Sequence, residues 1–227
     1  MREPTVSSVM TTKVITVGPE TSFKDVVETL SGNGISAVPV VGPQGKVVGV
    51  VSEADVLPKQ EFHGGADPQP RGLPRRRVRW YRSLGLCAAE VMTSPVVTIG
   101  PDDSVTLAAR RLAEKKVRRL FVVDTDDHLV GVVSRRDVLG TFLRPDSEIR
   151  TDIQETLNVT FGAEAERMTT RVTDGVAIVD GGLERRSQTA LVVRLIRSVP
   201  GVVGVRSNLG YRIDDMVETG AWTGFGP

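Results

Sequence analysis

Two copies of a Ser-x-x-Asp pattern hold the side chains of this sequence that are best suited to binding chemistry. One copy runs from Ser52 to Asp55 and the other from Ser134 to Asp137. Each follows a valine-rich run, at a point where a helix is expected to begin. A carboxylate accepts two hydrogen bonds from a cis-diol, and the free N–H groups of a helix N-terminus favour phosphate. The alternative is that each serine and aspartate only cap their own helix, which is the commoner role for either copy alone.

Groups for covalent or metal chemistry are scarce. The chain of 227 residues has one cysteine, Cys87, and two histidines, His63 and His128. A single thiol cannot form an intrachain disulfide, and this set is a poor source of nucleophile and base or of metal ligands. The sequence also contains no recognisable catalytic triad and no Walker-type glycine loop. We therefore expect a protein that is not an enzyme, requires no cofactor and binds no metal.

An internal repeat must position the two Ser-x-x-Asp copies. Val-Met-Thr at 9–11 recurs at 91–93, Gly-Pro at 18–19 recurs at 100–101, and Gly-Val-Val-Ser at 49–52 recurs at 131–134. Every pair is 82 positions apart, as Met10 and Met92 illustrate. The first repeat (9–57) and the second repeat (91–139) therefore align without a gap.

Each repeat is expected to have the element order βαββα. A short strand leads through Gly-Pro into a helix, for which Ser22 and Ser104 are candidate N-caps. Two further strands flank turn-forming residues at 43–45 and 125–127, which favours a hairpin in each repeat. A unit of about 50 residues buries a sheet face poorly when alone. The repeat thus predicts an intramolecular pair with pseudo-twofold symmetry in the α/β (α+β) class.

These shared motifs resemble a tandem pair of CBS domains, the module named after cystathionine beta-synthase. The resemblance covers roughly residues 6–143. It implies clefts between the paired domains that bind adenosine-containing ligands such as AMP, ADP, ATP or S-adenosylmethionine. It also implies that Asp55 and Asp137 contact ribose hydroxyls, and that Ser52 and Ser134 meet phosphate or ribose. Because paired CBS domains commonly associate into flat dimers, we expect a homodimer.

Basic residues distinguish the second repeat from the first. The resemblance implies a phosphate contact for a basic residue just before the strand, which here is Arg118 or Arg119, and Arg136 lies inside the second Ser-x-x-Asp pattern. Guanidinium groups match phosphate geometry, whereas Glu53 in the first pattern repels a nearby phosphate. The alternative is that these arginines form a solvated helix end.

We therefore expect different occupants in the two clefts. The cleft that uses Ser134, Arg136 and Asp137 is expected to bind the charged nucleotide. The Asp55 cleft is expected to be empty or to bind a less charged adenosine.

Two threonines complete the expected ligand site. The resemblance places Thr16 and Thr98 on the first strands, where they line an adenine or ribose pocket, although β-propensity also explains them. Phe121 departs from the pattern because it stands at the position of Pro39, where the family often has proline. Its ring is expected to narrow a pocket.

The segment between the repeats, 58–86, is rich in glycine, proline and arginine. Its first half is expected to be a mobile loop, and the whole segment a flexible linker. Arginines crowd from Arg71 to Arg82 around Trp80 and Tyr81. Such a run suits nucleic acid, an acidic membrane surface, a partner protein or the shielding of a cleft. Because charge runs are usually solvated faces, nucleic-acid binding is kept only as an alternative.

A different pattern begins after residue 145. Apolar residues at 149, 153 and 157 indicate a helix, and Asp174-Gly175 joins two predicted strands into a hairpin. A second helix stops at Pro200-Gly201, before a final strand that begins near residue 202, so the predicted order is αββαβ.

Residues 146–214 resemble a BON domain. The resemblance rests on the Val-Thr-Asp-Gly-Val hairpin, on an Asp-Gly-Gly turn at 180–182 and on Val-Pro-Gly-Val at 199–202. It implies a phospholipid, membrane-surface or protein partner, and no binding residues are assigned. The tail at 215–227 is expected to be flexible.

Together these patterns predict a cytoplasmic sensor that responds to an adenosine-type ligand. The expected CBS repeats span 1–57 and 87–143, and no signal peptide or membrane span of about 20 apolar residues is evident. One alternative is a membrane-surface or phospholipid-associated protein in which the CBS pair is structural. The second is nucleic-acid binding through the arginine run, with a steep dependence on salt.

Overall fold

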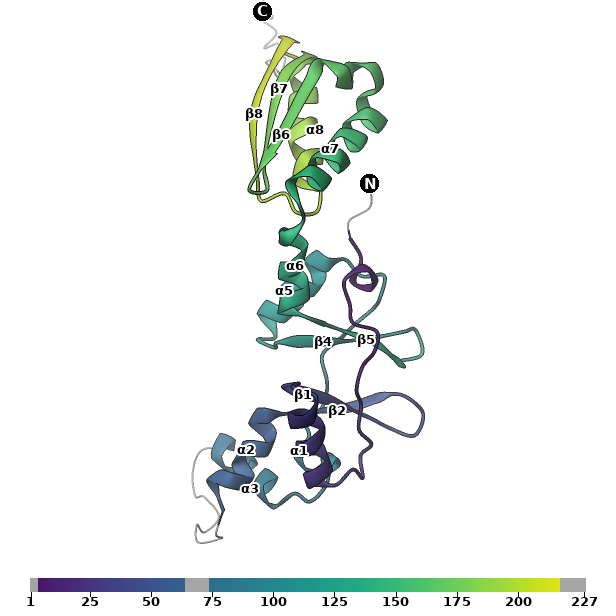
Figure 1. Ribbon diagram of the computed structural model, residues 1–227, viewed down its shortest axis with the longest axis vertical. Helices are drawn as coiled ribbons and strands as arrows, with labels where there is room; N and C mark the ends of the chain where they lie inside the picture. The colour runs from purple at the N-terminus through teal and green to yellow at the C-terminus, as the bar shows by residue number, and fades with distance from the viewer. Residues whose placement is uncertain (1–3, 64–73, 217–227) are drawn as a thin grey trace, which may run out of the picture. The chain divides into compact units, whose positions relative to one another are not determined.

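The computed structural model, which describes residues 4–63 and 74–216, gives both repeats a helix, a hairpin and a second helix in the same order (Figure 1). Ser22 Oγ accepts a hydrogen bond from Asp25 N at 3.2 Å at the start of helix α1 (Phe23–Gly32). Ser104 Oγ accepts one from Leu107 N at 3.1 Å at the start of helix α5 (Val105–Glu114). Both predicted N-caps are therefore confirmed.

A hairpin and a second helix follow in each repeat. The antiparallel pairs are β1 (Ala37–Val41) with β2 (Val47–Ser52), and β4 (Arg119–Val123) with β5 (Leu129–Ser134). Helices α2 (Glu53–Glu61) and α6 (Arg135–Gly140) begin directly after the two serines. The first strands, which the sequence pattern placed at 14–17 and 96–99, are shorter in the structure. Thr98–Ile99 forms strand β3, parallel to β4, and in the first repeat Val17 alone bridges to Val40.

The opening segment of each repeat packs on the other repeat. Val6, in the single turn η1 (Val6–Ser8), is buried in the core of the second repeat, and the short helix α4 (Ala88–Val91) is buried in the core of the first. Thr11 exchanges two backbone hydrogen bonds of 2.9 Å with Val132, and Thr93 exchanges two with Val50. The two repeats therefore form one unit, Thr5–Val138, here called the first unit.

This exchange explains two of the repeated motifs. Met10 covers Gly131, where an added Cβ would lie 2.6 Å from the methionine Sδ, and Met92 covers Gly49 in the same way. Only glycine allows so close an approach. The Val-Met-Thr and Gly-Val-Val-Ser motifs are thus the two halves of one contact, made twice.

Helix α3 (Pro74–Leu84) occupies part of the segment that we expected to be a flexible linker, 58–86. It packs against α2, and Lys59 Nζ donates hydrogen bonds to the carbonyl oxygens of Ser83 at 3.1 Å and Gly85 at 2.6 Å. The structure therefore differs from the expectation over 74–84, because these contacts hold the helix on α2. Arg71 and the rest of 64–73 lie outside the described residues.

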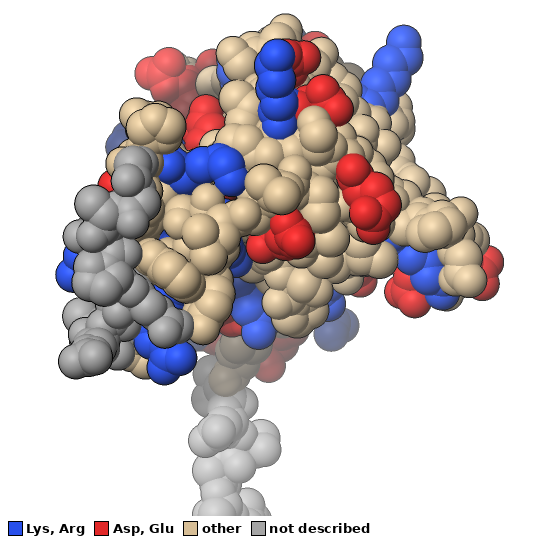
Figure 2. Space-filling model, turned by 90° about the horizontal axis from the view of Figure 1, so that it is seen from below, with Lys and Arg blue, Asp and Glu red and all other residues tan. Residues whose placement is uncertain are grey.

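Charges are mixed on the face near α3. Figure 2, which shows the first unit from below the view of Figure 1, on the side of α3, has basic and acidic side chains interspersed rather than one basic patch. Within the part of the helix that is described, Arg79 pairs with Glu61 and Arg82 pairs with Asp55. At least two arginines of the run therefore form ion pairs with carboxylates of α2.

The second unit consists mainly of the chain from Leu139 and has the predicted αββαβ order. The elements are α7 (Asp146–Phe161), β6 (Met168–Thr173), β7 (Val176–Arg185), α8 (Arg186–Arg197) and β8 (Gly204–Ile213). Strand β7 pairs antiparallel with β6 and parallel with β8, and both helices cover one face of the sheet (Figure 1). The single turns η2 (Thr141–Leu143) and η3 (Gly162–Arg167) flank α7.

One turn prediction in this unit is confirmed and another is wrong. Asp174 and Gly175 have φ of 51° and 74°, as a tight hairpin turn requires, so the predicted hairpin is confirmed. The Asp-Gly-Gly sequence at 180–182 does not end the strand, because β8 continues to pair with β7 as far as Arg185. None of the helices in the described ranges is long and apolar enough to cross a membrane.

We expect Gly181→Ala to lower the free energy of unfolding of the second unit by about 1–3 kcal/mol. Gly181 has φ of 146°, and a Cβ there would collide with the carbonyl oxygen of Arg167 and lie 3.1 Å from Met168 Cα. Hydrogen exchange of peptides from 168–185 in the full chain measures the loss. Gly182→Ala is the matched control, since a Cβ there meets nothing within 4 Å. Equal exchange in the two variants would contradict this prediction.

Candidate functional site

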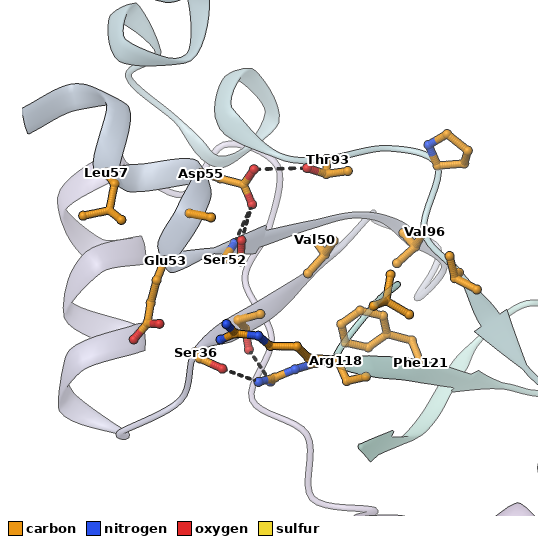
Figure 3. A pocket seen from close by; sticks show the side chains of 16 residues that line it. Ser36, Val50, Ser52, Glu53, Asp55, Leu57, Thr93, Val96, Arg118 and Phe121 are labelled. Carbon is orange, nitrogen blue, oxygen red and sulfur yellow. Dashed lines mark hydrogen bonds between the residues drawn. The ribbon is translucent and has the colours of Figure 1, made fainter. Parts of the chain in front are cut away.

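Two clefts in the first unit are related to each other by the internal repeat. The larger cleft is a cavity of about 540 Å³, and the smaller cleft is one of about 260 Å³. The larger cleft is lined by Ser36, Ala37, Val50, Ser52, Glu53, Ala54, Asp55, Leu57, Thr93, Pro95, Val96, Val97, Val117, Arg118, Arg119 and Phe121 (Figure 3). The smaller cleft is lined by Thr11, Lys13, Val14, Ile15, Ile35, Ala37, Pro39, Arg119, Phe121, Val132, Ser134 and Asp137. Except for Phe121, each residue of the smaller cleft is 82 positions from a residue of the larger one.

One wall of the larger cleft is apolar. It is formed by Val50 on β2, by Val96 in the chain before β3, and by the ring of Phe121 on β4 (Figure 3). Phe121 is only 2% exposed, so its ring is a fixed surface rather than a mobile one. Apolar walls with a few polar groups are typical of small-molecule sites of roughly 300–1,000 Å³. This wall suits the flat face of an aromatic base.

Two adjacent arginines reach the larger cleft and differ in what they contact. Arg119 donates to Ala37 O at 3.0 Å and to Ser36 Oγ at 2.6 Å, so it ties the second repeat to the first. Burial lowers the pKa of Arg119, and the neighbouring Arg118 lowers it further, while Glu53 and Asp137 raise it. Arg118 is exposed, and its guanidinium has no hydrogen bond or ion pair with any described residue. Arg118 is therefore the cation that remains available to an anion in this cleft.

Both Ser-x-x-Asp patterns cap the helix that they begin. Ser52 donates from its N at 2.9 Å and from its Oγ at 2.6 Å to Asp55 Oδ2. Ser134 donates in the same way to Asp137 Oδ2, at 2.7 Å from each atom. The capping alternative is confirmed for both copies, and it occupies one carboxylate oxygen in each.

The second carboxylate oxygen differs between the two copies. Asp55 Oδ1 accepts a hydrogen bond from Thr93 Oγ1 at 3.1 Å and forms an ion pair with Arg82 of α3. Asp55 is 5% exposed and lies among these partners. Asp137 is partly exposed, and its Oδ1 has no hydrogen-bond partner within 4–63 and 74–216. Only the second copy therefore keeps an acceptor free for a ligand.

The structure divides the candidate phosphate-binding residues of the second repeat between the two clefts. Ser52, Asp55 and Arg118 line the larger cleft, Ser134 and Asp137 line the smaller one, and Arg119 lines both. This corrects the expected grouping of the charged-ligand site around the second pattern. The cause is the packing of the repeats, in which the side chain of Arg119 reaches Ser36 and Ala37 of the first repeat although its backbone pairs with Ser134.

Three expected site residues line neither of these clefts. Arg136 is exposed on α6, Thr16 is exposed, and Thr98 lies in β3, where its carbonyl oxygen accepts a hydrogen bond from Arg111. The sequence reasoning also missed the specific role of Arg82. Its only signal was membership in an arginine run for which cleft shielding was one of several alternatives.

One group in the described ranges has the composition of a metal site. Asp124, Asp126 and His128 bring ligand atoms within 4.8 Å of one another in the turn between β4 and β5. Asp124 Oδ1 accepts the backbone N–H groups of Asp126 and His128, both at 2.9 Å. The hydrogen bond from the His128 backbone lowers the pKa of Asp124, and these bonds indicate that the carboxylate stabilises the turn.

Comparisons with known proteins identify the parts of the chain. The CBS domain matches residues 6–60 and 88–144, and the BON domain matches residues 145–212. The chloroplastic CBS domain-containing protein CBSX1 of Arabidopsis thaliana is 30% identical over 152 residues, which is 62% of this chain and 64% of CBSX1. The CBS domain-containing protein YhcV of Bacillus subtilis is 27% identical over 133 residues, which is 59% of this chain and 81% of YhcV.

A solved structure resembles the first part of the chain. The crystal structure of CBSX2 in complex with AMP has a TM-score of 0.53 and 32% identity, and covers 61% of this chain and 96% of that chain. The chain spans less than two thirds of two of these relatives, with 64% of CBSX1 and 58% of the full chloroplastic CBSX2 of Arabidopsis thaliana.

Proposed function

The chain carries two CBS domains followed by a BON domain, and on this basis we propose that it is a non-catalytic regulatory protein that binds an adenosine-type ligand. The ligand binds in the larger cleft, and the protein requires no cofactor. The observation that carries the proposal is the combination, in a cavity of about 540 Å³, of an apolar wall and Arg118, an arginine with no ion pair among the described residues. The AMP complex of CBSX2, at 32% identity, supports the same class of ligand.

The residues of the cleft suggest how such a ligand is held. The adenine packs against Val50, Val96 and Phe121, and the phosphate pairs with Arg118. Glu53 lines the same cleft and would repel additional phosphates. We therefore propose that AMP binds more tightly than ATP. This assignment replaces our expectation that the charged nucleotide uses Ser134 and Asp137.

A ligand in this cleft can act as a signal because the cleft lies between the repeats. It shifts their relative packing only if it binds one arrangement more tightly than the other. The second unit, with its BON domain, is proposed to deliver the response, in a homodimer. Phospholipid binding through 146–214 and nucleic-acid binding through the arginine run stay predictions, and neither is favoured by a contact or a patch in the described residues.

We expect Arg118→Ala to weaken AMP binding about tenfold, because it removes a charge-assisted hydrogen bond to the phosphate. Calorimetric titration of the full chain with AMP measures the affinity, and adenosine should bind the variant as it binds the native chain. Arg136→Ala is the control, since Arg136 is exposed and lines neither cleft. A native chain that gives no heat and no thermal stabilisation with AMP would refute the proposed function. A larger loss in Arg136→Ala than in Arg118→Ala would move the site to the second Ser-x-x-Asp pattern.

A further inference from the structure

Arg82 occupies the acceptor that the larger cleft would offer to a sugar. Asp55 lines this cleft, and a carboxylate is the group that accepts two hydrogen bonds from a cis-diol. An ionised carboxylate has about four acceptor sites. Asp55 already receives bonds from Ser52 N, Ser52 Oγ, Thr93 Oγ1 and Arg82, so no site remains free.

Several contacts fix Arg82 in this position. Its side chain is 22% exposed, and its second terminal nitrogen donates to Thr93 Oγ1 at 2.8 Å. Helix α3, which carries it, is held to α2 by Lys59, whose Nζ donates to the carbonyl oxygens of Ser83 and Gly85. The arginine is therefore held against Asp55 by a packed helix.

The internal repeat supplies a natural comparison. Asp137 lies in the first turn of its helix, as Asp55 does, and accepts the same two hydrogen bonds from its serine. Its Oδ1, however, has no partner among the described residues. Arg82 comes from the segment between the repeats, which the repeat itself does not duplicate. The Arg82–Asp55 ion pair is thus specific to the larger cleft. It is not part of the hydrogen bonding that both Ser-x-x-Asp patterns share.

We propose that Arg82 competes with the ligand for Asp55, so that an adenosine-type ligand engages this carboxylate only by displacing the arginine. The inference rests on the proposed function, and it makes Arg82 the residue that sets the affinity of the larger cleft and its dependence on the ribose hydroxyls. Neutral hydroxyls replace a cation at a carboxylate that is nearly buried, so the displacement opposes binding. Helix α3 thereby raises the ligand concentration at which the cleft fills.

The test is a titration of native, Arg82→Ala and Arg79→Ala chains with AMP and with 2′,3′-dideoxy-AMP. We expect Arg82→Ala to bind AMP about tenfold more tightly than the native chain, because two hydroxyl bonds to a carboxylate become available without displacement. Dideoxy-AMP should gain much less. Arg79→Ala is the matched control on the same helix, because Arg79 pairs with Glu61 rather than with Asp55, and its affinity for AMP should equal that of the native chain.

A second variant at position 82 distinguishes a change in AMP affinity from a folding defect. Arg82→Gln keeps a shorter hydrogen-bond donor without the charge, and it should bind AMP with an affinity between those of the native and Arg82→Ala chains. Unchanged or weaker AMP binding in both Arg82 variants, with a native chain that does bind AMP, would overturn the inference and leave the proposed function intact. An absence of AMP binding in every chain would overturn both.

Discussion

Replacing Phe121 by alanine is expected to lower the free energy of unfolding of the first unit by about 3–5 kcal/mol. The reason lies in how side chains alternate along β4. Leu120 and Val122 enter the core of the second repeat, so Phe121 between them points to the opposite face of the strand. There it is 2% exposed and lines both clefts, so its ring fills the space between the two repeats.

The expected loss of unfolding free energy is large because the surrounding backbone cannot relax to fill the cavity that the substitution leaves. The backbone around Phe121 is fixed by pairing with Thr98 of β3 on one side and with Val132 of β5 on the other. Urea denaturation measures the loss in a Trp222→Phe background, where Trp80 is the sole tryptophan and reports on the first unit. Phe121→Leu is the control, and should cost well under half as much. A loss below about 1 kcal/mol for Phe121→Ala would show that the ring is not a packing element.

Replacing Asp55 by alanine is expected to cost about 3 kcal/mol of unfolding free energy, because it leaves Arg82 without its anion in a mostly buried position. The side chains of the two partners are 7% and 22% exposed. The matched control is Asp137→Ala, which removes the same helix cap but no ion pair. It should cost about 1 kcal/mol, the usual value of an N-terminal cap.

A double-mutant cycle isolates the ion pair from the cap. The Asp55→Ala and Arg82→Ala double variant should be more stable than the sum of the two single losses indicates, since it leaves no unpaired charge. The same urea denaturation supplies all four values. Equal losses in Asp55→Ala and Asp137→Ala, or strict additivity in the cycle, would contradict a stabilising role for the Arg82–Asp55 pair.

Local features of the fold could be predicted because they depend on nearby residues. Ser22 and Ser104 act as caps through a hydrogen bond to an N–H group three residues away. The hairpin at Asp174-Gly175 depends on two residues that tolerate positive φ. The spacing of 82 positions likewise predicted two equivalent repeats, since identical motifs fold identically when their surroundings are equivalent.

Features that depend on pairing between distant segments could not be predicted in the same way. The repeat shows which residues are equivalent, but it does not say which repeat a segment packs on. The exchange of Met10 and Met92 between repeats was therefore missed, and Arg118 was grouped with the wrong Ser-x-x-Asp pattern. The length of β7 was also missed, because Gly181 and Gly182 favour a turn locally while pairing with β8 keeps them in the strand.

Arg82 illustrates a different limit of sequence reasoning. In the arginine run it is one of several equal charges, and composition alone favours a solvated face for all of them. What separates it from its neighbours is a nearly buried carboxylate 27 positions earlier in the chain. Only the packing of α3 against α2 brings these two groups together.

A crystal structure of the full chain grown with AMP tests the central claim most directly. We expect AMP in the larger cleft, with its base against Val50 and Phe121 and its phosphate within hydrogen-bond distance of Arg118. AMP bound instead in the smaller cleft beside Ser134 and Asp137, or no AMP in either cleft at a concentration that saturates the calorimetric titration, would contradict the assignment.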